Sequence, residues 1–163
     1  MPMLRQMSWN LTAKEMSVEL QIAETVADEI ANNFDCMAWV DALCNHLEMA
    51  TPGEVCIRIC NEAESQSLNA TYRGIDKPTN VLSFSADLVS DEPILGDLAI
   101  CWPVLVREAD EQHKTVVDHA AHMVVHGVLH LLGYDHQTGT AARTMEGIEI
   151  AVLRDLGITN PYL

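Results

Sequence analysis

The sequence is organised around one stretch, His126-Gly127-Val128-Leu129-His130-Leu131-Leu132-Gly133-Tyr134-Asp135-His136. An α-helix turns once in about 3.6 residues, so His126 and His130 lie on one helix face, where their imidazoles can meet at a single ion. Gly133 readily adopts the left-handed conformation that ends a helix, and the chain can then turn back and bring His136 to the same point. The spacing therefore predicts a metal site built from three histidines.

A structural role is the alternative for these histidines, since a single histidine on an apolar helix face is usually a satisfied core residue. Here three of them occur in a segment rich in Val and Leu, where several unpaired imidazoles would be costly to bury. Three imidazoles bind zinc and leave one coordination position open, which is the arrangement of catalytic zinc sites. We therefore expect one bound metal ion, with zinc favoured over the other metals that imidazole binds.

The residues before this motif predict a buried helix. Residues 115–132 are apolar on nearly every side of a helical wheel, so we expect this helix at the centre of the domain. His119 and His122 lie on the same stripe as His126 and His130, two turns and one turn before the first of them. We expect these two histidines in the core or behind the metal.

Hydrophobic periodicity and turn residues divide the rest of the chain into strands and helices. We expect strands over 17–23, 54–61, 81–84 and 96–101, and helices over 36–50, 62–72, 103–112 and 140–156. Asp35 is the expected N-cap of the first helix, and residues 17–30 could instead form a helix. Residues 1–16 show no clear period and are expected to be a loose N-terminal extension of a single domain that spans residues 1–163.

Composition and charge limit the function classes. The chain has 163 residues, enough for one domain with a substantial core, and its formal net charge of −15 divides into −6, −5 and −4 over residues 1–50, 51–100 and 101–163. Without a basic surface, non-specific binding to duplex nucleic acid is disfavoured, and we expect no DNA partner. No stretch resembles a signal peptide or a membrane-spanning helix, so we expect a cytoplasmic protein without a membrane partner.

The cysteines do not predict a second metal site or a disulfide framework. There are five of them, an odd number, and no pair has CxxC spacing. We expect reduced thiols that pack as small apolar side chains.

The same histidine spacing occurs in the metzincin peptidases, whose motif is HExxHxxGxxH. In those enzymes the glutamate directly after the first histidine is the general base that takes a proton from the zinc-bound water. This chain has Gly127 at that position. The metal site survives the change, but peptide hydrolysis by that mechanism loses its proton acceptor, so metallopeptidase activity is disfavoured.

Three motifs in one order resemble the YbeY family of bacterial endoribonucleases, the ribosomal RNA maturation factors. They are LNATYRGIDKPTNVLSF at 68–84, GDLAIC at 96–101 and HGVLHLLGYDH at 126–136. The resemblance covers about residues 55–136. It implies an α+β fold in which a small mixed β-sheet of about four strands packs around a central metal-carrying helix with additional helices and a zincin-like metal motif. One departure is Ser85, where the family commonly has proline.

The resemblance also implies site residues and an activity. The family's three zinc ligands match His126, His130 and His136, with one Zn²⁺ per chain, and its functionally important arginine matches Arg73. Members are metal-dependent endoribonucleases that act on single-stranded RNA, so the resemblance implies a zinc-dependent, single-strand-specific endoribonuclease. The implied role is in 16S rRNA 3′-end maturation, ribosome biogenesis and quality control. The implied partners are single-stranded rRNA precursor and the small ribosomal subunit or its proteins.

The chemistry of these residues is compatible with cleavage of a phosphodiester. Zinc can polarise a phosphoryl oxygen or lower the pKa of bound water to about 7, and Arg73 can offer a bidentate fork to phosphate oxygens. A surface ion pair with Asp76 or a nearby glutamate is the alternative for Arg73. The sequence identifies no general base, and attack by water and attack by the RNA 2′-hydroxyl both remain open.

Two further questions remain open at this level. The protein could be a non-catalytic, ribosome-associated binding factor with a structural metal. The strong negative charge favours this alternative, because contacts with basic ribosomal proteins would then bring the protein to the ribosome.

Several polar and aromatic residues near the motifs could contact RNA or orient a ligand, although turn bonding or packing explains each equally well. They are Lys77, Asn80, Ser83, Tyr134 and Asp135.

Overall fold

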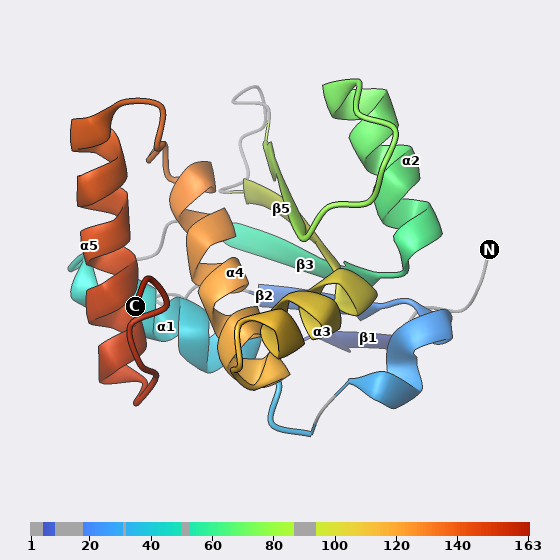
Figure 1. Ribbon diagram of the computed structural model, residues 1–163, viewed down its shortest axis with the longest axis horizontal. Coiled ribbons are helices and arrows are strands. Elements are labelled where there is room, and N and C mark those ends of the chain that lie inside the picture. The colour runs from blue at the N-terminus through green and yellow to red at the C-terminus, as the bar shows by residue number, and fades with distance from the viewer. Residues whose placement is uncertain (1–4, 9–17, 31, 50–52, 87–93) are drawn as a thin grey trace.

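The computed structural model describes residues 5–8, 18–30, 32–49, 53–86 and 94–163. One mixed β-sheet forms a layer, and most of the helices cover one of its faces (Figure 1). In spatial order the strands are β1 (Arg5–Ser8), β2 (Val18–Ile22), β3 (Glu54–Cys60), β5 (Ile94–Cys101) and β4 (Val81–Ser85). The helices are the 3-10 helix η1 (Glu24–Glu29), α1 (Cys36–His46), α2 (Glu62–Arg73), α3 (Trp102–Glu111), α4 (Val116–Leu131) and α5 (Gly139–Asp155).

The centre of the sheet is parallel and its edges are antiparallel. Strands β2, β3 and β5 run in one direction, whereas β1 pairs antiparallel with β2 and β4 pairs antiparallel with β5. Side chains alternate across a strand, and in β3 the fully buried Val55, Ile57 and Ile59 face the helical layer. The predicted alternation of this strand is confirmed.

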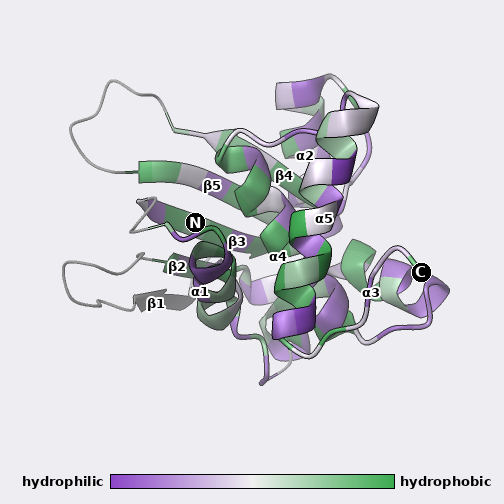
Figure 2. Cartoon of the chain, turned by 90° about the vertical axis from the view of Figure 1, so that its left-hand side faces the viewer, coloured by the Kyte–Doolittle hydropathy of each residue, from purple (hydrophilic) through white to green (hydrophobic). Residues whose placement is uncertain are grey.

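Helix α4 lies at the centre of the molecule. It packs against α1, α3 and α5 on its outer sides and against β4 and β5 beneath it (Figures 1 and 2). Ala120, Val124, Val125 and Val128 have no exposed surface. This helix was predicted to be buried on all sides, and the prediction is confirmed.

Side-chain caps fix the first residues of helices α4 and α5. The hydroxyl of Thr115 accepts a hydrogen bond from the amide of Asp118 at the start of α4, and Thr138 does the same for Ala141 at the start of α5, both at 3.1 Å. Gly133 follows α4 with φ +95°, in the left-handed region. The chain therefore reverses after α4, as the position of Gly133 predicts.

The expected α+β fold with a mixed sheet is confirmed, with corrections at its N-terminal side. The sheet has five strands rather than about four, because Arg5–Ser8 pairs with β2. These residues lie in the stretch expected to be loose, and their pairing satisfies backbone groups that β2 would otherwise expose. The rest of residues 1–16 lies outside the described residues. The alternative helix over 17–30 is wrong, since β2 is followed by η1.

Two other expectations concern α1 and the cysteines. Asp35 caps α1 by accepting a hydrogen bond from the amide of Ala38, as predicted, but the helix ends at His46 and not near residue 50.

All five cysteines are free thiols, four of them buried, which confirms their expected role as small apolar side chains. Among the described residues, no helix has both the length and the apolar character needed to cross a membrane.

Candidate metal centre

The three histidines of the organising motif come together at one point. Helix α4 carries His126 and His130 one turn apart, and the loop after Gly133 carries His136. Their ring centroids are separated by 4.6 Å, 5.6 Å and 5.1 Å for the pairs 126–130, 126–136 and 130–136. One nitrogen from each ring lies within 4.8 Å of the other two, so the three side chains could hold one metal ion.

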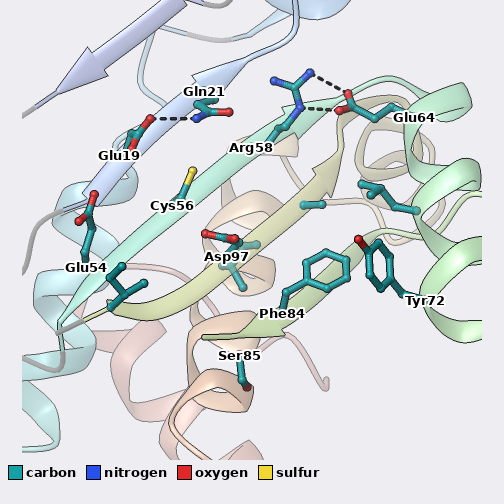
Figure 3. Close-up of a pocket in the computed structure, with 14 residues that line it drawn as sticks. Glu19, Gln21, Glu54, Cys56, Arg58, Glu64, Tyr72, Phe84, Ser85 and Asp97 are labelled. Carbon is teal, nitrogen blue, oxygen red and sulfur yellow. Dashed lines mark hydrogen bonds and ion pairs between the residues drawn. The ribbon is translucent and has the colours of Figure 1, made fainter. Parts of the chain in front are cut away.

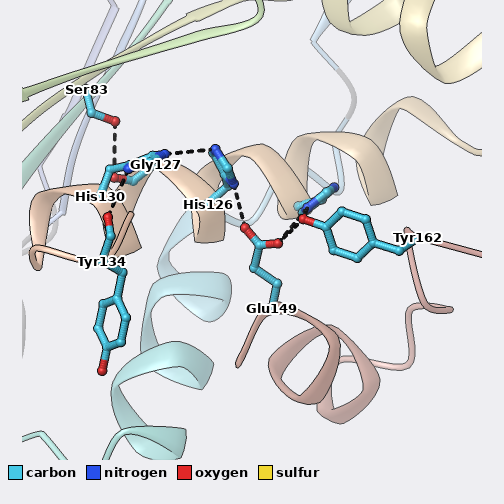
Figure 4. A network of polar contacts seen from close by, with 8 residues as sticks. Ser83, His126, Gly127, His130, Tyr134, Glu149 and Tyr162 are labelled. Atoms are coloured by element: carbon cyan, nitrogen blue, oxygen red, sulfur yellow. Dashed lines mark hydrogen bonds and ion pairs between the residues drawn. The ribbon is translucent and has the colours of Figure 1, made fainter. Parts of the chain in front are cut away.

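Hydrogen bonds at the Nδ1 atoms of His126 and His130 determine which ring nitrogen carries the proton. His126 Nδ1 is 2.5 Å from a carboxylate oxygen of Glu149, and His130 Nδ1 is 3.0 Å from the backbone carbonyl of Tyr134 (Figure 4). Both partners are acceptors, so each Nδ1 donates, and the neutral form of a ring held in this way has its lone pair on Nε2. Burial lowers the pKa of His130, and the nearby His126 and His136 lower it further, which keeps this ring neutral at pH 7.

The two Nε2 atoms of this pair face one another. They are 3.1 Å apart, a separation at which two lone pairs repel unless a cation lies between them. Two donors at 2.0–2.1 Å from one tetrahedral zinc ion are about 3.3 Å apart. The spacing of these nitrogens therefore suits a shared metal ion.

Behind this pair lies a buried carboxylate that is not part of the sequence motifs. Glu149 of α5 has no exposed surface and accepts hydrogen bonds from His126, His122 and the hydroxyl of Tyr162. Burial raises the pKa of Glu149, but these three donors outweigh burial and hold it at about 2. The sequence does indicate that Glu149 is buried, because it lies on the apolar stripe of its helix, four residues from Met145 and from Leu153.

The other two histidines of α4 lie in the interior, as expected. His122 is buried, with Nε2 3.3 Å from Glu149, so it faces the carboxylate behind the metal centre. His119 instead bonds to Glu108 of α3 at 2.6 Å, and Asn80 donates to the same carboxylate. His122 thus belongs to the surroundings of the site, while His119 ties α4 to α3.

An open cleft of about 680 Å³ leads to the three histidines. Its walls are the end of α2, residues 79–85 and residues 135–137. Arg73, the last residue of α2, lines this cleft together with the histidines. Within the described residues it forms no ion pair, and Asp76, the expected alternative partner, accepts a hydrogen bond from Gln66 instead. The exposed guanidinium is therefore available to a ligand in the cleft.

The further candidates from the sequence have structural contacts. Ser83 donates to the carbonyl of Gly127 at 3.2 Å, and Asp135 accepts from the amide of Gln137 at 3.2 Å. The side chain of Asn80 bonds to the amide of Val81 as well as to Glu108. Tyr134 packs against the core, and Lys77 is exposed and is not part of the cleft wall.

The absence of a side chain at position 127 is required by packing. A Cβ atom added to Gly127 would lie 2.8 Å and 3.0 Å from the two methyl groups of Leu98 and 3.3 Å from Val81. A glutamate, the general base of the metzincins, has no room here. The packing therefore agrees with the conclusion that the peptidase mechanism is disfavoured.

A second hollow lies over the opposite face of the sheet and differs in charge. It has a volume of about 800 Å³ and is lined by the carboxylates of Glu19, Glu54 and Asp97 (Figure 3). Burial and the neighbouring Glu19 raise the pKa of Asp97. The Arg58 guanidinium there bonds to Glu64 at 2.5 Å and 3.0 Å. This acidic hollow repels polyanions, so the histidine cleft is the site that suits a phosphate-bearing ligand.

Comparisons with known proteins agree with the sequence motifs. The chain matches the family described as Endoribonuclease YbeY over residues 15–157. An Endoribonuclease YbeY from Alteromonas mediterranea is 51% identical over 141 residues, which are 85% of this chain and 89% of that protein. The solution structure of TM1509 from Thermotoga maritima has a TM-score of 0.55 and 22% identity, covering 86% of this chain and 91% of that chain. At this identity the likeness to TM1509 concerns the fold.

Proposed function

Because the chain belongs to the YbeY family of endoribonucleases, we propose that it is a zinc-dependent enzyme that cleaves single-stranded ribosomal RNA precursors. The proposed zinc ligands are His126, His130 and His136, with one ion per chain. Arg73 is the proposed catalytic residue. The observation that carries the proposal is the pair of Nε2 atoms 3.1 Å apart at the base of a cleft that Arg73 also lines.

The residues present fit a catalytic zinc ion. Neutral imidazoles with free Nε2 lone pairs are zinc ligands, and three of them leave a coordination position open toward the cleft. This set has no oxygen ligand, which disfavours calcium or magnesium at the three histidines. When bound, zinc would polarise a phosphoryl oxygen and make a bound water more acidic.

The chain itself supplies binding and charge stabilisation. Arg73 would bind the non-bridging oxygens of the scissile phosphate and stabilise the negative charge that develops there during cleavage. Its position at the end of α2 places it across the cleft from α4. The cleft has few cations, so a single strand whose phosphates enter one at a time suits it better than a duplex.

The wider cellular role is part of the same proposal. We propose one domain over residues 1–163, located in the cytoplasm, that works with the small ribosomal subunit in rRNA 3′-end maturation and quality control. The net charge of −15 supports contact with basic ribosomal proteins. The same charge favours the second candidate function, a non-catalytic ribosome-associated factor whose metal is structural.

Replacement of Arg73 by alanine separates the two functions. An arginine that contacts the transition state should lower cleavage of a fluorescent single-stranded RNA by about a hundredfold to a thousandfold. Zinc content and melting temperature should not change, because Arg73 is exposed and is not a proposed ligand. Arg154→Ala, which removes an exposed arginine from the last turn of α5, is the matched control and should retain activity. Wild-type cleavage by a zinc-loaded Arg73→Ala protein would contradict the catalytic role.

A further inference from the structure

We propose that Glu149 and Tyr162 act together as positioning residues that fix the protonation pattern and direction of His126. Glu149 would hold the ring proton on Nδ1 and thereby keep Nε2 free for the metal, while Tyr162 would hold the carboxylate in place. The inference rests on the proposed function in so far as His126 is a metal ligand. Its central observable, the tautomer of His126, is measured on metal-free protein and does not depend on nuclease activity.

The first argument is the burial of the carboxylate. Glu149 lies inside the apolar face of α5 with no exposed surface, where an unpaired charge would be strongly destabilising. Its two oxygens have separate partners, with Oε1 2.5 Å from His126 Nδ1 and Oε2 bonded to Tyr162 and His122 (Figure 4). A carboxylate in such a place is costly unless these contacts compensate for it.

The second argument is the direction of the hydrogen bond to His126. An ionised carboxylate only accepts, so in the neutral form of His126 this contact places the ring proton on Nδ1. Without this acceptor, nothing in the contacts of His126 keeps the proton there, and a proton on Nε2 would block the atom that faces His130. Outer partners of this kind set the orientation and basicity of ligand histidines in metal sites.

The third argument is the route of the chain after α5. The backbone turns at Asn160, whose side chain accepts a hydrogen bond from the amide of Tyr162 at 2.8 Å. The turn directs a half-exposed tyrosine inward, so that its ring lies edge-on to His122 at a centroid distance of 5.5 Å and its hydroxyl donates to Glu149. Because Tyr162 holds one oxygen, the carboxylate cannot rotate freely away from His126.

A second metal site is the competing explanation for this cluster. His122, His126 and Glu149 also have ligand atoms within 4.8 Å of one another. However, the hydrogen bond from Nδ1 already uses the atom of His126 that would bind a second ion. The two explanations predict different numbers of bound ions, one and two per chain.

The test uses the full-length chain with its metal removed, and Zn²⁺ as the only probe. Long-range ¹H–¹⁵N NMR reports which nitrogen of His126 carries the proton, and competition with a chromogenic chelator gives the zinc affinity and stoichiometry. Glu149→Gln replaces a carboxylate that only accepts with an amide that also donates, so the population of the Nδ1–H tautomer should fall. Zinc binding should weaken by about tenfold to a hundredfold. Tyr162→Phe should change both quantities in the same direction by less.

Asp155→Asn is the matched control, because it removes an exposed carboxylate from the end of α5 that has no part in the contacts of His126, Glu149 and Tyr162. It should leave the tautomer and the zinc affinity at their wild-type values. If Glu149→Gln fails to fold, Tyr162→Phe decides the question, since it removes one hydroxyl from a half-exposed side chain. An unchanged tautomer and unchanged affinity in the folded variants would overturn the proposal, even if stability fell. Two zinc ions per wild-type chain would overturn it as well.

Discussion

At the scale of single residues, position 127 separates this chain from the zinc peptidases that share its histidine spacing. Gly127 lies on the side of α4 that contacts the sheet, and its carbonyl accepts a hydrogen bond from Ser83. The side chains of Leu98 and Val81 occupy the space that a Cβ atom would need. The missing glutamate is thus a consequence of how closely α4 packs on β4 and β5.

Gly127→Ala should therefore destabilise the protein although alanine favours helices. The new methyl group must displace Leu98, and overpacking of this kind costs about 1–3 kcal/mol. Gly147→Ala on α5 is the control, since no atom lies within 4 Å of its Cβ position, and it should stabilise the helix by up to about 1 kcal/mol. Urea unfolding measures both changes. Equal stability of Gly127→Ala and wild type would show that Leu98 moves aside without strain.

The residues of the site differ in how far the sequence could predict them. His126, His130 and His136 are close in the chain, and helix geometry with one glycine is enough to bring them together. Arg73 required the family resemblance, because nothing local connects the end of α2 to α4. Glu149 is 23 residues from His126 and joins it only through the packing of α5 on α4, which a local pattern does not encode.

At the scale of elements, α5 supports the proposed metal centre. It packs against α4 and α1, and it carries Glu149 on its buried side. Thr138 caps its first turn directly after the loop that holds His136. The start of this helix therefore lies close in the chain to one of the proposed ligands.

Thr138→Ala should lower the free energy of unfolding by about 1 kcal/mol, because the amide of Ala141 loses its side-chain partner. The matched control is Thr144→Ala, within the same helix, where the hydroxyl bonds back to the carbonyl of Thr140. There alanine improves helix propensity, so stability should not fall. Chemical denaturation compares the two, and a Thr138→Ala protein as stable as Thr144→Ala would exclude the capping role.

Helices and strands with a strong hydrophobic period were predicted well, whereas a strand defined only by backbone pairing was not. Alternation in β3 and the all-round apolar character of α4 identify them without further information. Strand β1 has no such pattern, since it is defined by backbone pairing with β2. The early end of α1 at His46 also escapes periodicity, because Leu43 and Leu47 continue the apolar stripe past the last helical residue.

At the scale of the whole molecule, the two faces of the sheet have different chemistry. The helical side carries the histidine cleft with Arg73, while the opposite side carries the acidic hollow with Glu19, Glu54 and Asp97. Arg73 and the proposed zinc ion would attract a negatively charged RNA to the first, whereas the carboxylates of the second repel it. The cleft and the hollow adjoin at Tyr72, Phe84 and Ser85, but the three carboxylates line only the hollow. The overall charge of −15 thus does not conflict with an RNA substrate.

Zinc binding by the metal-free chain and its His136→Ala variant tests the central claim most directly. His136 is exposed and comes from a loop, so its removal should leave the fold intact while taking away one of the three proposed ligands. Calorimetric titration should give one Zn²⁺ per wild-type chain, and the variant should bind it far more weakly at an unchanged melting temperature of the metal-free protein. Equal zinc affinity in the two proteins, or no zinc binding by the wild type, would contradict the account.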